Sequence, residues 1–294
     1  MGAASPDDFI LVTPSVIEAP LRAALTRLGR ELGEAWRPTS ARSAVFLGEP
    51  KAAVRAMMSQ GVLTTREAVW HVSERLARAS ELADRPPVAI LTEAELLAHP
   101  ARALGELLAG LGLQAPIAAL QEAAEVFGRI DRRDETLSED PWLEALDLYA
   151  ALPLANGIRT LWPATLFQSG DRPGQTCPDI IDVTGRARIL AYGPYLSLPP
   201  GRWRASARFE ICAEAARRPY RLEFAAGGET AAVTHRPVDR GMQTVRLDVV
   251  VTEPGPTEVR LWIDRAAFHG ALRFLGVDME YVGRTEPAPA ERIA

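Results

Sequence analysis

The spacing of apolar residues changes near residue 155, and no other feature of the sequence constrains the fold as strongly. Before this point apolar residues recur at helical spacing; after it apolar and polar residues alternate, and glycine and proline become frequent. A chain of 294 residues can bury two separate cores. We therefore predict an α/β domain over residues 1–155, an all-β domain over 156–284 and a disordered tail over 285–294.

In the first half, short apolar runs alternate with helical patterns. The predicted strands cover residues 9–12, 43–47 and 88–91, and the predicted helices cover 19–32, 51–60, 66–82, 93–97, 100–111 and 117–127. Strands that alternate with helices are typical of a parallel sheet, which with three strands would be a reduced one.

In the second half, short strands are separated by glycine- and proline-containing turns. Apolar side chains fall on every second residue of 203–211, which places Trp203 in the core. Further strands are predicted at 220–224, 244–251, 259–264 and 272–281, and the block Tyr192-Gly193-Pro194-Tyr195 is predicted to be rich in turns. Regular short strands of this kind are typical of a β-sandwich.

Residues 185–212 read GRARILAYGPYLSLPPGRWRASARFEIC. This stretch resembles the opening strands of a jelly-roll β-sandwich of the carbohydrate-binding-module kind, which is often appended to bacterial proteins that handle polysaccharide. The resemblance implies that the second domain recognises a sugar.

Several side chains of the second domain have the chemistry of a sugar site, because sugar rings stack on aromatic groups while polar groups bind their hydroxyls. Tyr192 and Tyr195 either bind in this way or pack at the sandwich edge. Alternation along 259–264 puts Arg260, Trp262 and Asp264 on one face, where Trp262 would serve as a platform or as a contact with another domain or subunit. His269 is a further candidate, in a predicted loop.

Two segments of the first half, Val45-Phe46-Leu47-Gly48-Glu49-Pro50 and Ala89-Ile90-Leu91-Thr92-Glu93 with its continuation to Leu113, resemble strand–turn–helix blocks of sulfotransferases. The resemblance covers roughly residues 9–115. It departs from the family at the phosphate-binding loop, where residues 13–20 contain no Gly, Lys or Arg and Glu18 would repel a phosphate. Gly48 also stands where the family has an arginine. The resemblance therefore implies an inherited fold more than a retained activity.

The bulk properties exclude several functions. A net charge of −5 disfavours non-specific nucleic-acid binding, and no apolar run approaches the roughly 20 residues that span a bilayer. Two cysteines and four scattered histidines do not predict a zinc site. We expect no catalytic residues, no cofactor and no metal.

The leading hypothesis is non-catalytic recognition of bacterial surface or capsular polysaccharide by the second domain. One alternative is a divergent sulfotransferase that acts on glycan. Another is an oligomeric spike or fibre subunit of a phage-like particle that attaches to host capsule. No secretory signal is visible at the N-terminus, so we expect a cytoplasmic protein or a particle component released by lysis.

Overall fold

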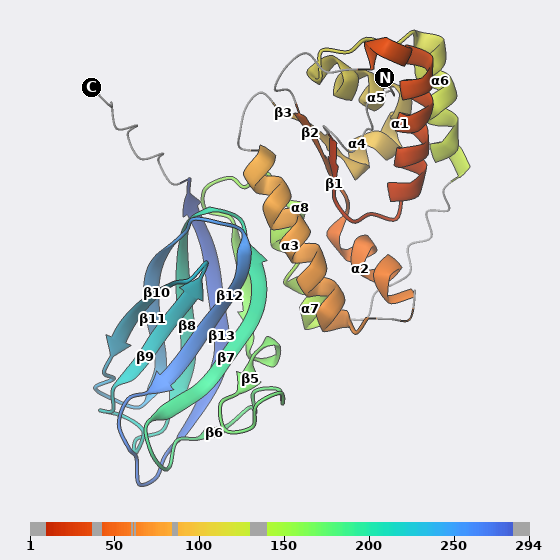
Figure 1. Ribbon diagram of the computed structural model, residues 1–294. Helices are drawn as coiled ribbons and strands as arrows, with labels where there is room; N and C mark the ends of the chain where they lie inside the picture. The colour runs from red at the N-terminus through yellow and green to blue at the C-terminus, as the bar shows by residue number, and fades with distance from the viewer. Residues whose placement is uncertain are drawn as a thin grey trace, which may run out of the picture. The chain divides into compact units, whose positions relative to one another are not determined.

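The structure is a computed structural model, and it describes residues 10–36, 43–59, 61, 63–83, 88–129 and 140–284. The chain forms two compact units, Met1–Asp140 and Pro141–Ala294 (Figure 1). The second unit thus begins at Pro141, earlier than the predicted boundary at 155/156. The predicted tail over 285–294 lies outside the described residues.

The first unit is built on a three-stranded parallel sheet in the order β1-β2-β3. Its strands are β1 (Ile10–Val12), β2 (Ser43–Leu47) and β3 (Val88–Thr92). Its helices are α1 (Glu18–Leu32), α2 (Pro50–Ser59), α3 (Thr65–Ala83), α4 (Glu93–Ala98), α5 (Pro100–Gly110) and α6 (Ile117–Ala124), with 3₁₀ turns η2 (Gly33–Ala35) and η3 (Glu125–Arg129). The sequence pattern predicts each of these strands and α-helices to within two or three residues at either end.

Both faces of the central strand β2 are covered. Ala44 and Phe46 belong to a core shared with α1, α5 and α6, to which α1 contributes the predicted stripe of Leu21, Leu25 and Leu28. Val45 is equally buried and, by alternation, points to the opposite face. Helix α3, which contacts β2 and β3, buries Val69, Val72 and Leu76.

The second unit begins with two short helices, α7 (Pro141–Glu144) and α8 (Asp147–Ala150), which precede its first strand. The Tyr149 hydroxyl of α8 donates a 2.5 Å hydrogen bond to the backbone oxygen of Ser197 in β7 (Arg188–Leu198). These helices account for the misplaced boundary: they share the helical spacing of the first unit, although they pack with the second.

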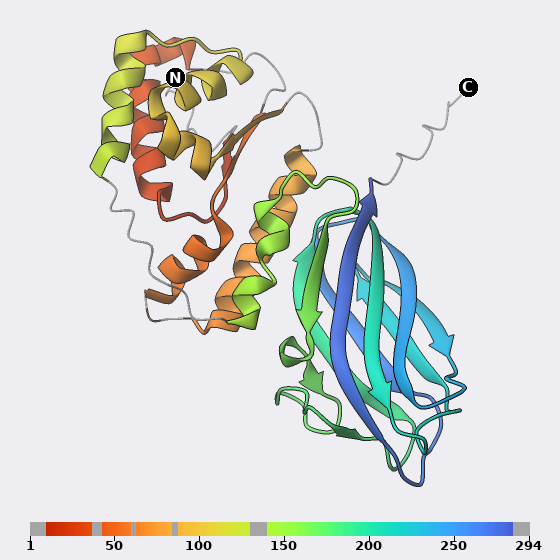
Figure 2. The same ribbon diagram turned by 180° about the vertical axis from the view of Figure 1, so that it is seen from behind.

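The rest of the second unit consists of two antiparallel sheets. One has the strand order β10-β9-β12-β7-β5, and the other has the order β11-β8-β13-β4 with β6 paired to β13. The remaining strands are β4 (Arg159–Pro163), β5 (Gln168–Ser169), β6 (Ile181–Asp182), β8 (Gly201–Ile211), β9 (Tyr220–Ala226), β10 (Glu229–His235), β11 (Gly241–Val251), β12 (Gly255–Ile263) and β13 (Ala271–Gly283), and η4 (Ala164–Leu166) follows β4. Figure 2, the reverse view, brings the second of these sheets to the front. The unit is a β-sandwich.

Apolar side chains from the two sheets meet between them. The Phe209 ring of β8 lies 5.4 Å, centroid to centroid, from the Tyr220 ring of β9 in the other sheet. Trp203 is fully buried, as its place in the alternation predicts, and its indole Nε1 donates to the backbone oxygen of Pro199. Alternation along β9 places Tyr220, Leu222 and Phe224 on its inward face, and all three are buried.

The block around Gly193-Pro194 is not a turn, and this prediction is wrong. It lies inside the continuous strand β7, where the pairing with β12 shifts register between Pro256 and Glu258. Tyr195 has a φ of 68°, in the left-handed region. Glycine and proline indicate a turn in a bare sequence, but they also occur at β-bulges, where one strand carries an extra residue.

Candidate functional site

Charged and aromatic side chains gather on the outer face of the sheet β10-β9-β12-β7-β5. Along β12 the side chains of Val259, Leu261 and Ile263 are buried in the core, and Arg260 and Trp262 point the other way, as the alternation predicts. We call this outer surface the polar face. It consists of Tyr192, Tyr195, Arg221, Glu223, Glu258, Arg260, Trp262 and Asp264.

Five charged side chains of the polar face form one continuous chain of ion pairs. In order they are Glu258, Arg260, Glu223, Arg221 and Asp264. Arg260 pairs with Glu258 and lies 2.5 Å from Glu223, while Arg221 lies 2.8 Å from Glu223 and 3.1 Å from Asp264. The Glu223 side chain is only 8% exposed, so these pairs are poorly screened by solvent.

The Tyr195 phenol ends this chain on the β7 side. Its hydroxyl donates a 2.8 Å hydrogen bond to Glu258. Burial, with the hydrogen bond to the Glu258 carboxylate as the next cause, raises the pKa of Tyr195 well above its ordinary value. The hydroxyl therefore remains a donor over the whole neutral range. The hydrogen bond to Glu258 likewise raises the pKa of Arg260, which stays charged.

The bulge in β7 brings two tyrosines together. Residues an odd number apart on a regular strand point to opposite faces, so Tyr192 and Tyr195 would be separated by the sheet. With the bulge, their ring centroids lie 6.4 Å apart in an edge-to-face arrangement. The Tyr192 hydroxyl donates to Gln168 on β5 at 3.0 Å. The result is an aromatic pair with both hydroxyls held in place.

Trp262 is half-buried, and one side of its ring is already in use. The Arg221 guanidinium carbon lies 4.6 Å from the ring centroid, in a cation–π contact across the β9–β12 pairing. The buried indole Nε1 has no hydrogen-bond partner among the described residues. Trp262 is therefore a stacked member of the polar face, with an unsatisfied donor, and not a bare platform.

The structure unites most of the predicted site residues and adds others. Asp264 joins the polar face through Arg221, whereas His269 lies exposed in the loop between β12 and β13. Arg221, Glu223 and Glu258 are not among the predicted site residues. Alternation along β9 orients Arg221 and Glu223, and alternation along β12 orients Glu258, but their partnership depends on β9 lying beside β12, which a sequence pattern does not reveal.

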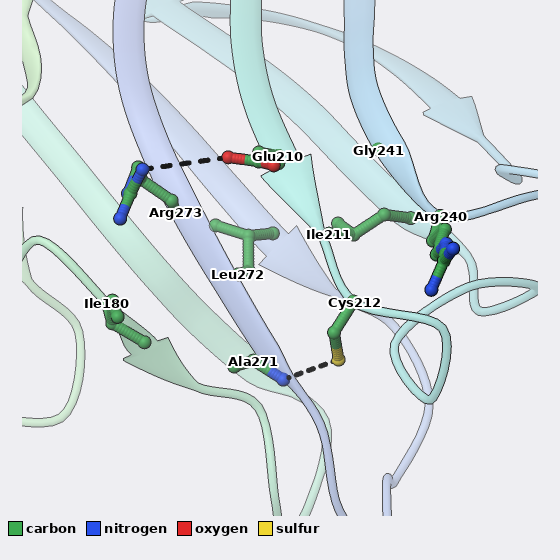
Figure 3. A pocket seen from close by; sticks show the side chains of 9 residues that line it. All are labelled: Ile180, Glu210, Ile211, Cys212, Arg240, Gly241, Ala271, Leu272 and Arg273. Atoms are coloured by element: carbon green, nitrogen blue, oxygen red, sulfur yellow. Dashed lines mark hydrogen bonds and ion pairs between the residues drawn. The ribbon is translucent and has the colours of Figure 1, made fainter.

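The opposite sheet also carries arginines on its outer face, and several of them are neutralised there. Arg204 pairs with Asp248 at 2.7 Å, and Arg208 pairs with Asp278 at 2.9 Å. A hollow of about 530 Å³ opens near the end of this sheet (Figure 3). In it Arg273 lies 3.7 Å from Glu210, and the Cys212 sulfur accepts a hydrogen bond from the Ala271 backbone nitrogen. Cys177 and Cys212 are both free thiols.

In the first unit, the chain's own carboxylates lie at the ends of the parallel strands. Glu49 accepts hydrogen bonds from the backbone nitrogens of Lys51 and Ala52, at the start of α2. Glu93 accepts from the Ser15 hydroxyl and the Glu49 backbone nitrogen, and burial raises the pKa of Glu93. The backbone N–H groups at the start of α2 therefore already bind a carboxylate of the chain itself, and its negative charge opposes the binding of a phosphate there.

Gly48 is required by close packing. A Cβ atom at this position would lie 2.3 Å from the backbone oxygen of Pro14, so no larger residue fits without displacing the chain. Among the described residues, no group of three or more His, Cys, Asp or Glu side chains is placed to hold a metal ion. None of the described helices is long and apolar enough to cross a membrane.

Comparisons with known proteins give matches to solved structures alone. No family model and no curated protein matches the chain. The chain is similar to the carbohydrate-binding module TmCBM61 in complex with β-1,4-galactotriose, with 10% identity over 40% of this chain and 90% of that one and a TM-score of 0.31. It is also similar to the CBM22-1 xylan-binding domain of Paenibacillus barcinonensis Xyn10C (12% identity, 45% and 86% covered, TM-score 0.28). A third match is the Stig cyclase Fisc of Fischerella sp. TAU (13% identity, 46% and 94% covered, TM-score 0.28).

These similarities are too distant to carry an argument about function. The two sheets of the second unit define a β-sandwich in their own right. The sulfotransferase resemblance of residues 9–115 finds no support in these similarities.

Proposed function

We propose that the second unit recognises a carbohydrate and that the polar face is its binding surface. The observation that carries this proposal is the edge-to-face pair of Tyr192 and Tyr195 beside the ion-pair chain on the same face of one sheet. Aromatic rings offer surfaces for the C–H faces of a sugar, and the neighbouring carboxylates and guanidinium groups offer partners for its hydroxyls.

The polar face is organised before any ligand arrives. Arg260 is held by both Glu258 and Glu223, and Tyr195 is held by Glu258. A sugar hydroxyl that binds to these groups would not have to order them first, which lowers the entropic cost of binding. The unsatisfied Nε1 of Trp262 would act as a further donor if the Arg221 side chain shifted to admit the ligand.

The charge of the face favours a sugar segment without anionic groups. The three carboxylates Glu223, Glu258 and Asp264 outnumber the two guanidinium groups of Arg221 and Arg260. We propose that the physiological ligand is a bacterial surface or capsular polysaccharide and that this chain binds it without catalysis. A sulfotransferase reaction is not part of the proposal, because residues 13–20 contain no Gly, Lys or Arg and the Glu49 carboxylate occupies the start of α2.

An array of bacterial capsular and exopolysaccharides, probed with the full-length protein, tests the proposal. We expect binding by the wild type and its loss in Tyr192→Ala/Tyr195→Ala. Phe268→Ala is the matched control, because Phe268 is an aromatic residue that is 89% exposed and does not belong to the polar face. Absence of binding to every glycan, or equal binding by the double tyrosine variant, would overturn the proposal.

A further inference from the structure

Four arginine residues line one pocket at the end of the sandwich. The pocket has a volume of about 220 Å³, and its walls are Arg217, Arg218, Arg236 and Arg265 together with Ala216 and Pro219. The arginines come from the three loops that follow β8, β10 and β12. We call this site the arginine pocket.

The arginine pocket has no negative charge of its own. None of its four guanidinium groups forms an ion pair within the part of the chain that the structure describes. The nearest acidic residue in sequence, Asp264, is engaged by Arg221 of the polar face. The lining residues therefore carry four positive charges and no negative one, which gives the pocket a positive potential.

Backbone hydrogen bonds fix the loops that carry these arginines. The Arg217 nitrogen donates to the Pro237 oxygen at 2.8 Å, and the Asp264 nitrogen donates to the Pro219 oxygen at 3.0 Å. The Arg218 guanidinium donates one 2.6 Å hydrogen bond to the Ala266 oxygen, which anchors the side chain and leaves its other donors available. The three loops are therefore tied to one another without a ligand.

We propose that the arginine pocket binds a tetrahedral oxyanion, that is, a sulfate or phosphate group. Guanidinium groups present their N–H donors in a planar fork that matches pairs of oxygen atoms on such groups. A volume of about 220 Å³ leaves room for the anion and for part of whatever carries it. The carrier is either the free inorganic ion or an ester substituent on a sugar.

The arginine pocket and the tyrosine pair of the polar face are different sites, although Asp264 of the polar face precedes Arg265 of the pocket. Its arginines belong to loops, whereas the tyrosines of the polar face belong to β7. Tyr192→Ala/Tyr195→Ala should therefore leave anion binding unchanged, and the two proposals can fail separately.

The test is calorimetric titration of the full-length protein with sodium sulfate, against sodium chloride at the same ionic strength. The variant Arg236→Gln/Arg265→Gln removes two exposed charges and is expected to weaken sulfate binding at least tenfold. Arg246→Gln, an exposed arginine on β11 with no ion pair to a described residue, is the matched control and should bind as the wild type does. Circular dichroism verifies that each variant is folded.

Galactose 6-sulfate, compared with galactose and with inorganic sulfate, identifies the carrier. Tighter binding of the ester than of the inorganic ion would indicate a sugar substituent, and equal binding would indicate a free ion; both results support the pocket. Sulfate binding no stronger than that of chloride, or an equal loss in the double variant and in Arg246→Gln, would overturn it.

Discussion

The polar face and the arginine pocket use arginine in opposite ways. On the polar face each guanidinium group lies between two carboxylates, so the charges neutralise one another and the surface is ordered and closely packed. The arginine pocket is lined by four arginines, and no acidic residue is among its lining residues. The first arrangement suits an uncharged ligand that is recognised by its shape and its hydroxyl groups. The second suits a ligand that supplies the missing negative charge.

The largest expected effect comes from breaking the ion-pair chain of the polar face. Arg260→Ala leaves Glu223 and Glu258 without their shared partner in poorly solvated positions, so we expect the free energy of unfolding to fall by about 2 kcal/mol. Urea unfolding of the full-length protein measures the change.

Arg204→Ala provides the comparison for this prediction. Arg204 pairs with Asp248, whose side chain is 67% exposed, and lies 3.9 Å from Glu280, which also pairs with Arg159; the loss of Arg204 should therefore leave the unfolding midpoint unchanged. If the two variants unfolded at the same urea concentration, the polar face would be no more than an ordinary charged surface.

Removing the tyrosine hydroxyl at the end of the ion-pair chain should lower the free energy of unfolding by a smaller amount. Tyr195→Phe deletes a hydrogen bond to a carboxylate and is expected to cost about 1 kcal/mol, and Tyr192→Phe, whose partner is the neutral Gln168, about half as much. Thermal unfolding of both variants gives the ranking. A larger loss of stability in Tyr192→Phe than in Tyr195→Phe would contradict the assignment of Tyr195 as the tyrosine that is bonded to the ion-pair chain.

The raised pKa of Tyr195 also predicts how the free energy of unfolding changes with pH. The folded protein holds the phenolic proton more tightly than the unfolded chain, whose phenol titrates near 10.0. The stabilisation is thus fully present below pH 10 and is lost as the pH rises from there through the folded-state pKa. Wild-type protein should lose stability above pH 10 more steeply than Tyr195→Phe. Parallel curves of unfolding free energy against pH would contradict the assigned environment of Tyr195.

The smallest effect, and one of opposite sign, is expected in the arginine pocket. Without sulfate, Arg236→Gln/Arg265→Gln relieves repulsion and should leave the melting temperature unchanged or raise it by about 1 °C. With sulfate, the wild type should gain thermal stability and the double variant should not. A destabilised double variant in sulfate-free buffer would mean that these arginines have internal partners.

Local patterns in the sequence predict five strands of the second unit, β8, β9, β11, β12 and β13. They also predict the orientation of individual side chains, as β12 shows: Val259, Leu261 and Ile263 face inward and Arg260 and Trp262 face outward. They do not predict which strands become neighbours, so Arg221 and Glu223 of β9 were not connected with Arg260. Nor do they distinguish a turn from a bulge at Gly193-Pro194, because both accept the same residues.

Two further features of the structure were not predicted from the sequence, for similar physical reasons. Strand β10 was not predicted because its alanine- and threonine-rich sequence alternates only weakly between apolar and polar residues. The arginine pocket was not predicted because it depends on three loops, far apart in sequence, meeting at one end of a sandwich.

The central claim is that a carbohydrate binds on the polar face, and the indole N–H signal of Trp262 in NMR tests it most directly. The signal is assigned by its absence in Trp262→Phe, and the protein is titrated with a fragment of the polysaccharide that binds best on the array. We predict that the Trp262 signal shifts with the fragment, because its Nε1 is an unsatisfied donor on this face, and that the signal of the buried Trp203 does not. A fragment that binds and leaves the Trp262 signal in place would contradict the assignment of this face as the binding surface.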